Sequence, residues 1–160
     1  DYDVIINIQG DEPLIEADMI DMIVDAFRQE ELCMCTLKHK LDSWEDIENP
    51  NQVKVVTDKN DYALYFSRSI LPYPRKENID LYYKHIGIYG YTRNFVLEYA
   101  AMASTPLENS ESLEQLRVLE NGYRIKVLET SHQSVGVDTQ EDLEKVCKWI
   151  EERGITIENY

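Results

Sequence analysis

A short β-branched run that ends in a polar turn constrains this chain most. The apolar residues Val4–Ile8 lead directly into Gln9-Gly10-Asp11-Glu12-Pro13. Such a run, closed by Gly and Pro, is typical of a buried parallel strand that ends in a tight turn. Ligands of open α/β sheets bind beyond the carboxyl ends of the strands, so Asp11 is expected where a metal–phosphate group would bind. The alternative is that Asp11 and Glu12 only occupy the turn and open a helix, whose start suits acidic residues.

The pattern after this turn alternates between helix and strand. Apolar residues at helical spacing predict a helix over residues 17–29, and residues 33–37 are expected to form a second strand, which gives a βαβ unit with a parallel strand pair. The remaining pattern predicts a hairpin of residues 53–57 and 63–66, a strand over 83–91, a helix over 93–102, a helix entry at Thr105, a helix around 112–120, a strand over 124–129 and a last helix from Val137 on. That last helix places Leu143, Val146, Cys147 and Ile150 on its apolar face. The predicted fold class is α/β.

The composition limits the partners of the chain. A net charge of −15 over 160 residues opposes nucleic-acid binding, which needs Lys and Arg to neutralise phosphates. No apolar stretch is long enough to span a bilayer and no secretion signal opens the sequence, so we expect no membrane partner and a cytoplasmic location. An anionic substrate would then require a divalent metal or a few well-placed cations. The three cysteines are expected to be reduced, structural thiols.

Several short motifs occur in a fixed order along the chain. They are Asn7-Ile8-Gln9-Gly10-Asp11-Glu12-Pro13, Val53-Lys54-Val55-Val56, Tyr65-Phe66-Ser67-Arg68-Ser69, His85-Ile86-Gly87-Ile88-Tyr89, Leu107-Glu108, Glu111-Ser112-Leu113-Glu114-Gln115-Leu116-Arg117 and Gly136-Val137-Asp138-Thr139. From Asp3 to about Glu152 the chain resembles the CMP-Kdo synthetases, the 3-deoxy-manno-octulosonate cytidylyltransferases. The resemblance implies a Rossmann-like nucleotide-diphospho-sugar transferase fold with a mixed, mostly parallel sheet. It also implies one partial domain over residues 1–160, with a smaller β-rich subdomain at residues 53–92.

The resemblance implies an enzyme that transfers CMP from CTP to 3-deoxy-D-manno-octulosonate (Kdo) and releases pyrophosphate, for lipopolysaccharide synthesis. Asp11 and Asp138 match the family's two catalytic, metal-binding aspartates. Mg²⁺ suits this role because it takes one or two carboxylates together with substrate phosphate oxygens. The alternative for Asp138 is a helix N-cap, a position that Thr139 can also fill.

The residues that match the family's sugar-acid site are Gln9, Arg68, His85, Tyr89, Glu114, Gln115 and Arg117. A guanidinium such as that of Arg68 can bind the Kdo carboxylate in bidentate fashion. Each residue has a structural alternative: a surface ion pair for Arg68, a buried structural histidine for His85, an intrahelical pair for Arg117 and a loop brace for Gln9. His39 and His132 lie outside the motifs and are expected to be structural or surface residues.

Tyrosines concentrate in the 53–92 segment, and aromatic residues of this kind are enriched at protein interfaces. The resemblance implies that this segment packs against its copy in a homodimer; the alternative is ordinary cover for a small sheet. Family members also open with a basic, glycine-containing loop for the CTP phosphates, which is not found before Asp1, so we expect the C-terminal part of a synthetase. Two other functions stay open: activation of another 2-keto sugar acid of the sialic type, and a non-catalytic dimerisation or sugar-acid-binding module.

Overall fold

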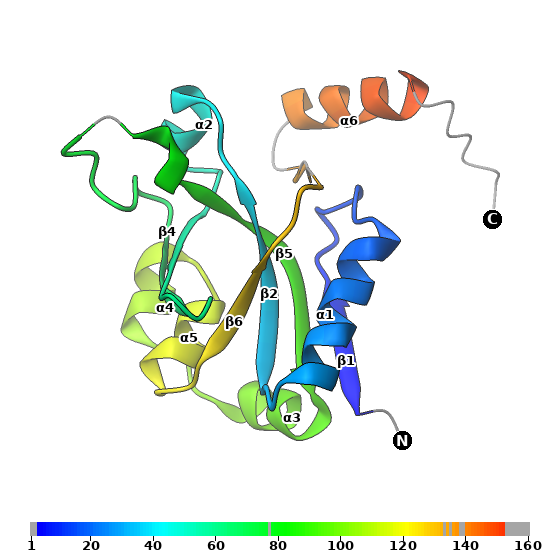
Figure 1. The fold of residues 1–160 in the computed structure, drawn as a ribbon, viewed down its shortest axis with the longest axis vertical. Coiled ribbons are helices and arrows are strands. Elements are labelled where there is room, and N and C mark those ends of the chain that lie inside the picture. Colours follow the sequence, from blue (N-terminus) through cyan, green and yellow to red (C-terminus); the bar gives the residue numbers. More distant parts are fainter. Residues whose placement is uncertain (1–2, 77, 133, 135, 138–139, 153–160) are drawn as a thin grey trace.

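The structure is a computed structural model that describes residues 3–76, 78–132, 134, 136–137 and 140–152 (Figure 1). The strands are β1 (Val4–Ile8), β2 (Met34–Lys40), β3 (Lys54–Thr57), β4 (Ala63–Ser67), β5 (Tyr83–Thr92) and β6 (Ile125–Glu129). The helices are α1 (Ala17–Gln29), α2 (Trp44–Glu48), α3 (Arg93–Ala101), α4 (Pro106–Glu111), α5 (Gln115–Glu120) and α6 (Gln140–Glu152), with a 3-10 turn at Ile79–Leu81. The order of helices and strands confirms the predicted α/β class.

The strands form one mixed sheet in the order β4-β3-β5-β2-β6, and β1 pairs with β5. Because β2 pairs along one side of β5 from Tyr83 to Tyr91, β1 and β3 share the other side. The predicted parallel pair of β1 and β2 is therefore wrong: the two strands run in the same direction, but β5 lies antiparallel between them. Among the described strands only β2 and β6 pair in parallel, so the sheet is mixed but not mostly parallel as expected. Strands β3 and β4 form the predicted hairpin.

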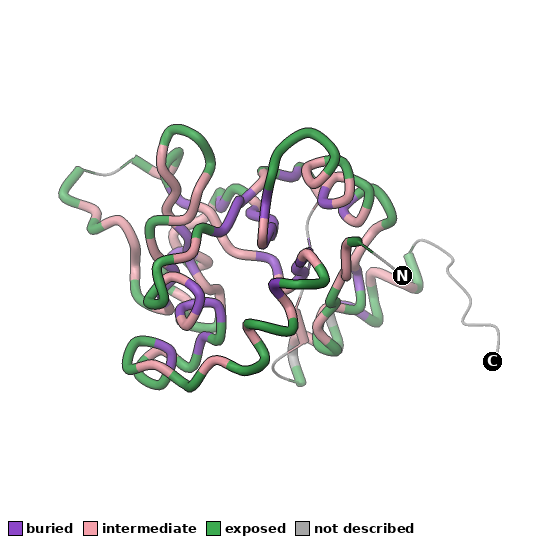
Figure 2. Tube along the Cα trace, turned by 90° about the horizontal axis from the view of Figure 1, so that it is seen from below, coloured by how far each residue is buried: buried purple, intermediate pink, exposed green. Residues whose placement is uncertain are grey.

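Alternating side chains of β5 supply two cores on opposite faces of the sheet. Ile86 and Ile88 pack with Met19 and Ile23 of α1, whereas Tyr89 and Tyr91 belong to a second cluster. That second cluster also holds Phe95 of α3 and Leu116 and Val118 of α5. The sheet thus lies between α1 on one side and α3 and α5 on the other, and the buried segments run through the middle of the molecule (Figures 1 and 2). The strand predicted over residues 83–91 is confirmed as β5.

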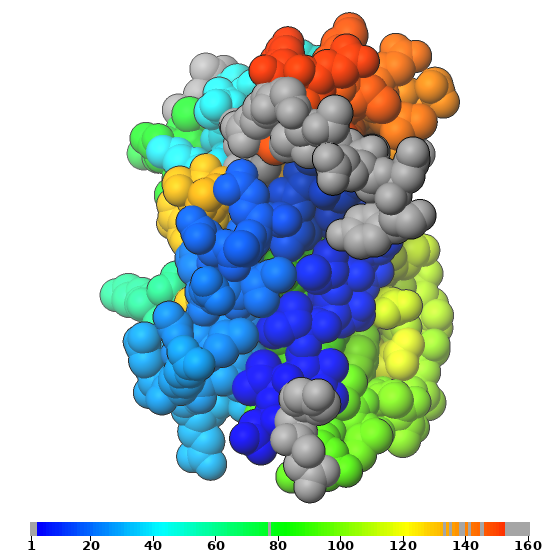
Figure 3. All heavy atoms as spheres, turned by 90° about the vertical axis from the view of Figure 1, so that its right-hand side faces the viewer, coloured from blue at the N-terminus to red at the C-terminus, as the bar shows by residue number. Residues whose placement is uncertain are grey.

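The C-terminal half departs from two predictions. Ser112 adopts a left-handed backbone conformation at φ 53° and ends α4, so the helix expected around residues 112–120 begins only at Gln115. On α6, Val146 is buried, but Cys147 and Leu143 are exposed, so the expected apolar face is only partly covered. Figure 3 shows α6 above α1 and β1, which lie side by side on that face of the molecule. None of the helices in the described ranges has the length and apolar character that a bilayer span requires.

Helix α1 packs closely against β5 at Gly90. A Cβ atom at this position would lie 2.7 Å from Cε2 of Phe27 and would also clash with the side chain of Ile23. The absence of a side chain at Gly90 therefore sets how close α1 packs to β5, and hence where the turn between β1 and α1 is held.

We expect Gly90→Ala to lower the free energy of unfolding by about 1–3 kcal/mol, because the added methyl group overpacks this interface. Equilibrium denaturant unfolding measures the change. The matched control is Gly10→Ala, since a Cβ atom at Gly10 meets no atom within 4 Å. A Gly90→Ala protein as stable as the control would contradict the close packing.

Candidate active site

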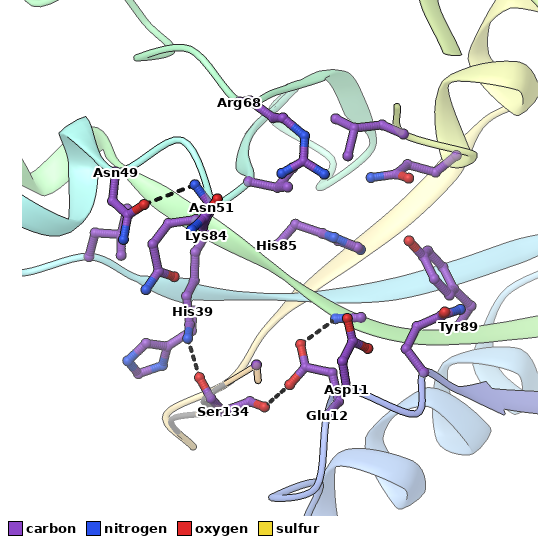
Figure 4. Close-up of a pocket in the computed structure, with 18 of the residues that line it drawn as sticks. Asp11, Glu12, His39, Asn49, Asn51, Arg68, Lys84, His85, Tyr89 and Ser134 are labelled. Carbon is purple, nitrogen blue, oxygen red and sulfur yellow. Dashed lines mark hydrogen bonds between the residues drawn. The ribbon is translucent and has the colours of Figure 1, made fainter. Parts of the chain in front are cut away.

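A cavity of about 490 Å³ opens where β1 and β2 end and β5 begins. The turn after β1 forms one side of it, and Arg68, directly after β4, lies on the opposite side with His85 between them (Figure 4). The segment of residues 112–115 before α5 completes the wall. The position agrees with the rule that ligands of α/β sheets bind beyond strand ends.

Most of the predicted site residues lie around this cavity although they are far apart in the sequence. Those that line it are Gln9, Asp11, Arg68, His85, Tyr89, Glu114 and Gln115. Arg117 is not among the lining residues, because its guanidinium is paired with the Glu108 carboxylate and its Nη1 donates to the Met102 carbonyl. Arg117 therefore holds α4 and α5 together. It forms a structural ion pair, but the pair joins two helices and does not lie within one. Asp138 lies outside the described residues.

Hydrogen bonds tie the turn after β1 to two other segments. The Glu12 carboxylate accepts the Gly87 N–H at 3.1 Å and a hydrogen bond from the Ser134 hydroxyl (Figure 4). The Gln9 N–H donates to the Gly87 carbonyl at 3.1 Å. Gly87 permits this approach, since a Cβ atom there would lie 3.2 Å from Cγ of Glu12. The sequence pattern placed Glu12 in the turn without a partner, and the structure gives it one on β5 and one beyond β6.

The segment beyond β6 also contacts the Asp11 backbone. The Val137 N–H donates to the Asp11 carbonyl at 2.8 Å, so the residue before Asp138 is joined directly to the other predicted metal aspartate. Within the described ranges no group of three His, Cys, Asp or Glu side chains is arranged to hold a metal. A site for Mg²⁺ requires fewer protein ligands than that, because one or two carboxylates and substrate phosphates suffice. Asp11 in the cavity wall fits this requirement.

Arg68 places a cation on the side of the cavity away from Asp11 (Figure 4). The Arg68 guanidinium donates from Nε to the Glu111 carbonyl at 3.0 Å and from Nη1 to the Pro50 carbonyl at 3.3 Å. Backbone oxygens thus orient the Arg68 guanidinium, and the Glu111 carboxylate accepts the Arg68 backbone N–H at 3.0 Å. Beneath it, Lys54 is fully buried and donates to the Asn49 carbonyl at 2.8 Å. Burial, together with the nearby Arg68 charge, lowers the pKa of Lys54 to about 8.

Lys84 is a further cation that the sequence motifs did not single out. It lines the cavity and its ammonium donates to the Ser134 carbonyl. Burial lowers the pKa of Lys84, and the Glu12 and Asp46 carboxylates act in the opposite direction. A lysine directly before a motif histidine in a β-rich run is the signal that could have identified it. His39, expected to be structural or on the surface, also lines the cavity and donates from Nδ1 to the Thr130 carbonyl at 3.0 Å.

Aromatic rings enclose His85 and continue from the cavity into the core. The imidazole lies edge-on to Phe66 at 5.1 Å between ring centroids and 5.3 Å from Tyr89. Tyr89 stacks on Tyr91, which stacks on Tyr99. Burial lowers the pKa of His85 to about 3 and raises the pKa of Tyr89 well above its usual value. Both side chains are therefore neutral at physiological pH and offer hydrogen bonds rather than charge.

The cavity thus combines an oriented guanidinium, further cations, neutral hydrogen-bonding side chains and an aspartate at the end of β1. Such groups can bind an anion through the cations and hydroxyl groups through hydrogen bonds. Residues 1–127 match the family model described as "Cytidylyltransferase". The chain belongs to the cytidylyltransferase family.

The relatives of known name agree with this assignment. The chain is 65% identical over 158 residues to the 3-deoxy-manno-octulosonate cytidylyltransferase of Fusobacterium nucleatum subsp. nucleatum, a match that covers 98% of this chain and 64% of the relative. It is 53% identical to the protein of the same name from Geobacter metallireducens, over 92% of this chain and 63% of the relative. The chain therefore spans about 64% of the length of the relative from Fusobacterium nucleatum.

Solved structures show the same fold. A CMP:2-keto-3-deoxy-manno-octonic acid synthetase in complex with CTP superposes with a TM-score of 0.85 at 39% identity, over 94% of this chain and 63% of that protein. The nucleotide-diphospho-sugar transferase fold is thereby confirmed. A putative glucose-1-phosphate thymidylyltransferase from Bacillus anthracis shares the fold more distantly, with a TM-score of 0.61 at 18% identity over 98% of this chain and 57% of that protein.

We expect the free energy of unfolding to decrease as the pH falls below the range in which an unfolded histidine becomes protonated. An unfolded histidine binds a proton below about pH 6.5, whereas burial lowers the pKa of His85 in the folded chain to about 3. Protonation therefore favours the unfolded state between these values, by at most about 1.4 kcal/mol per pH unit.

Denaturant unfolding of the wild type and of His85→Gln at several pH values, from about 7.5 down to about 5, measures this contribution. That interval lies above the range in which most carboxylates titrate, so their contribution is small. The variant should lose the corresponding part of the slope. Equal slopes in the two proteins would contradict the buried, neutral state of His85.

Proposed function

We propose that the whole protein transfers CMP from CTP to Kdo with release of pyrophosphate, and that this chain supplies the sugar-acid site and the metal-binding aspartates. The main support is that seven residues matched to the family's catalytic and sugar-acid positions, Asp11 among them, line one cavity. The names of the relatives and the CTP-bound structural neighbour support the choice of substrates. The proposal includes a role in lipopolysaccharide synthesis, as the family resemblance implies, and a cytoplasmic location.

In this proposal different side chains bind different parts of the sugar acid. The Arg68 guanidinium, oriented by two backbone carbonyls, holds the Kdo carboxylate. Gln9, Tyr89, Glu114 and Gln115 supply hydrogen bonds for the sugar hydroxyls from three sides of the cavity. The reacting anomeric hydroxyl is then positioned against the α-phosphate of CTP, and positioning of this kind accounts for much of the catalysis of phosphoryl transfer.

Asp11 and Asp138 would hold Mg²⁺ in this proposal. The bound ion would neutralise phosphate charge and favour departure of pyrophosphate. The hydrogen bond from Val137 to the Asp11 carbonyl supports the pairing, because it ties the chain next to Asp138 to the Asp11 turn. Glu12 serves as the brace of that turn, since its carboxylate is committed to Gly87 and Ser134.

Pyrophosphate release from CTP and Kdo by the full-length protein with Mg²⁺ tests the proposal. Asp11→Asn should reduce the rate by about two orders of magnitude or more, because a metal-binding charge is lost. Asp21→Asn on the exposed side of α1 is the matched control and should turn over like the wild type. Release of pyrophosphate with a sialic acid and not with Kdo would show that the sugar acid is of the sialic type and would contradict Kdo as the substrate. No release with either, under conditions in which the protein is folded, would overturn the enzymatic function.

We also propose that the full-length protein forms a homodimer through residues 53–92. This segment exposes Leu64, Tyr73 and Leu81, with 62%, 83% and 56% of each residue accessible to solvent. Strand β4 is also the edge of the sheet, and exposed apolar side chains next to an open edge favour association.

Leu81→Asp should weaken this dimer, because a carboxylate would be buried against apolar side chains of the partner. Light scattering across a dilution series measures the molar mass. Leu97→Asp on α3 is the matched control, since Leu97 is 63% exposed and lies outside the segment. A monomeric wild-type protein, or dissociation by the control variant alone, would refute the proposed interface.

A further inference from the structure

Strand β5 is irregular beside the cavity. Thr36 of β2 pairs with Tyr89, but the next residue, Leu37, pairs with Ile86. Gly87 and Ile88 are therefore extra residues on β5, and a bulge of this kind disturbs the regular hydrogen bonding of the two strands. On the opposite side of the same stretch, towards β1, the Gly87 N–H is bonded to Glu12 and the Gly87 carbonyl accepts from the Gln9 N–H.

The hydroxyl of Thr36 fills the other side of the bulge. Thr36 is fully buried, and its Oγ1 lies 2.7 Å from the Ile88 carbonyl and 3.3 Å from the Ile86 carbonyl. The same oxygen lies 2.9 Å from Nε2 of His85. One side-chain oxygen thus joins two backbone carbonyls of β5 to the imidazole in the cavity wall.

The number of available protons fixes the direction of these hydrogen bonds. A hydroxyl carries one proton, and a carbonyl oxygen only accepts, so the Thr36 proton points to the Ile88 carbonyl. The remaining short contact needs a proton from the other side, and His85 Nε2 must supply it. The imidazole is therefore the Nε2–H tautomer, and its Nδ1 carries a lone pair. Among the described residues no protein group donates to this Nδ1.

We propose that Thr36 is a positioning residue that fixes His85 as a neutral Nε2–H imidazole, so that Nδ1 accepts a hydrogen bond from a hydroxyl of the bound sugar acid. The substrate part of this inference rests on the proposed function. A neutral acceptor at this position recognises a hydroxyl and gives no attraction to a carboxylate, which leaves the acid group to Arg68. A site built around a hydroxyl discriminates strongly against analogues that lack it, because the acceptor is then left without a partner.

The ring nitrogens of His85 report the tautomer directly in ¹⁵N spectra of full-length protein labelled at histidine, with no substrate present. His85→Gln assigns the signal. In the wild type near neutral pH we expect a pyrrole-type shift for Nε2 and a pyridine-type shift for Nδ1. The opposite pattern, or two protonated nitrogens, would overturn the proposal. This measurement does not depend on which reaction the protein catalyses, so it fails separately from the proposed function.

Two substitutions at Thr36 test its role. Thr36→Val keeps the shape of the side chain and removes the hydroxyl, and it should alter the His85 shifts and raise KM for the sugar acid by roughly tenfold with KM for CTP unchanged. Thr36→Ser retains the hydroxyl and should restore both. Wild-type shifts and sugar KM in Thr36→Val would overturn the proposal. If Thr36→Val does not fold, the tautomer of the wild type and the behaviour of Thr36→Ser still decide.

Discussion

The position of β5 between β1 and β2 is the constraint on which both the core and the cavity depend. Its ten residues pair with β1 and β2 and contact β3, so it joins the N-terminal strands to the hairpin. Its alternating side chains then serve different purposes. One face packs against α1, and the opposite face carries His85 into the cavity and Tyr89 into the aromatic stack. A displacement of β5 would therefore disturb packing and substrate contacts together.

The cavity carries both signs of charge. Its lining includes the cations Lys40, Arg68 and Lys84, and the carboxylates of Asp11, Glu12, Asp42, Asp46, Glu114 and Asp142. The protein carries a formal charge of −15, yet Arg68 and Lys84 line one cavity and Lys54 is buried beside Arg68. The first two donate to backbone carbonyls, which orient the cations. The Glu12 and Asp46 carboxylates lie near Lys84, whereas Arg68 forms none of the ion pairs found among the described residues. Arg68 is therefore the cation best placed to attract an anionic ligand in an otherwise acidic protein.

Local patterns in the sequence predicted most strands and helices, but long-range pairing lay beyond them. The run Val4–Ile8 and the strand after α1 were both recognised, whereas nothing in their residues indicates that β5 inserts between them. The motifs likewise predicted Arg68 and Gln115 as site residues, and both line the cavity. Arg117 was misplaced because its partner, Glu108, belongs to a separate helix, and only tertiary structure brings the two together. Lys84 and Ser134 were missed for the same reason: their importance comes from contacts made across the sheet.

The stretch of β5 around Gly87 and Ile88 contacts distant residues on both of its edges. On the β1 side, beyond the last residue of β1, the Gly87 N–H bonds to the Glu12 carboxylate and the Gly87 carbonyl accepts from the Gln9 N–H. On the β2 side, the Ile88 carbonyl accepts a hydrogen bond from the Thr36 hydroxyl. The backbone of this stretch thus forms hydrogen bonds with the turn that carries Asp11 and with the Thr36 side chain that orients His85. Since an unpaired buried backbone group costs about 1–3 kcal/mol, the bulge and these polar side chains stabilise one another. Loss of either would leave the other without partners, which makes the cavity and this stretch of β5 a single structural unit.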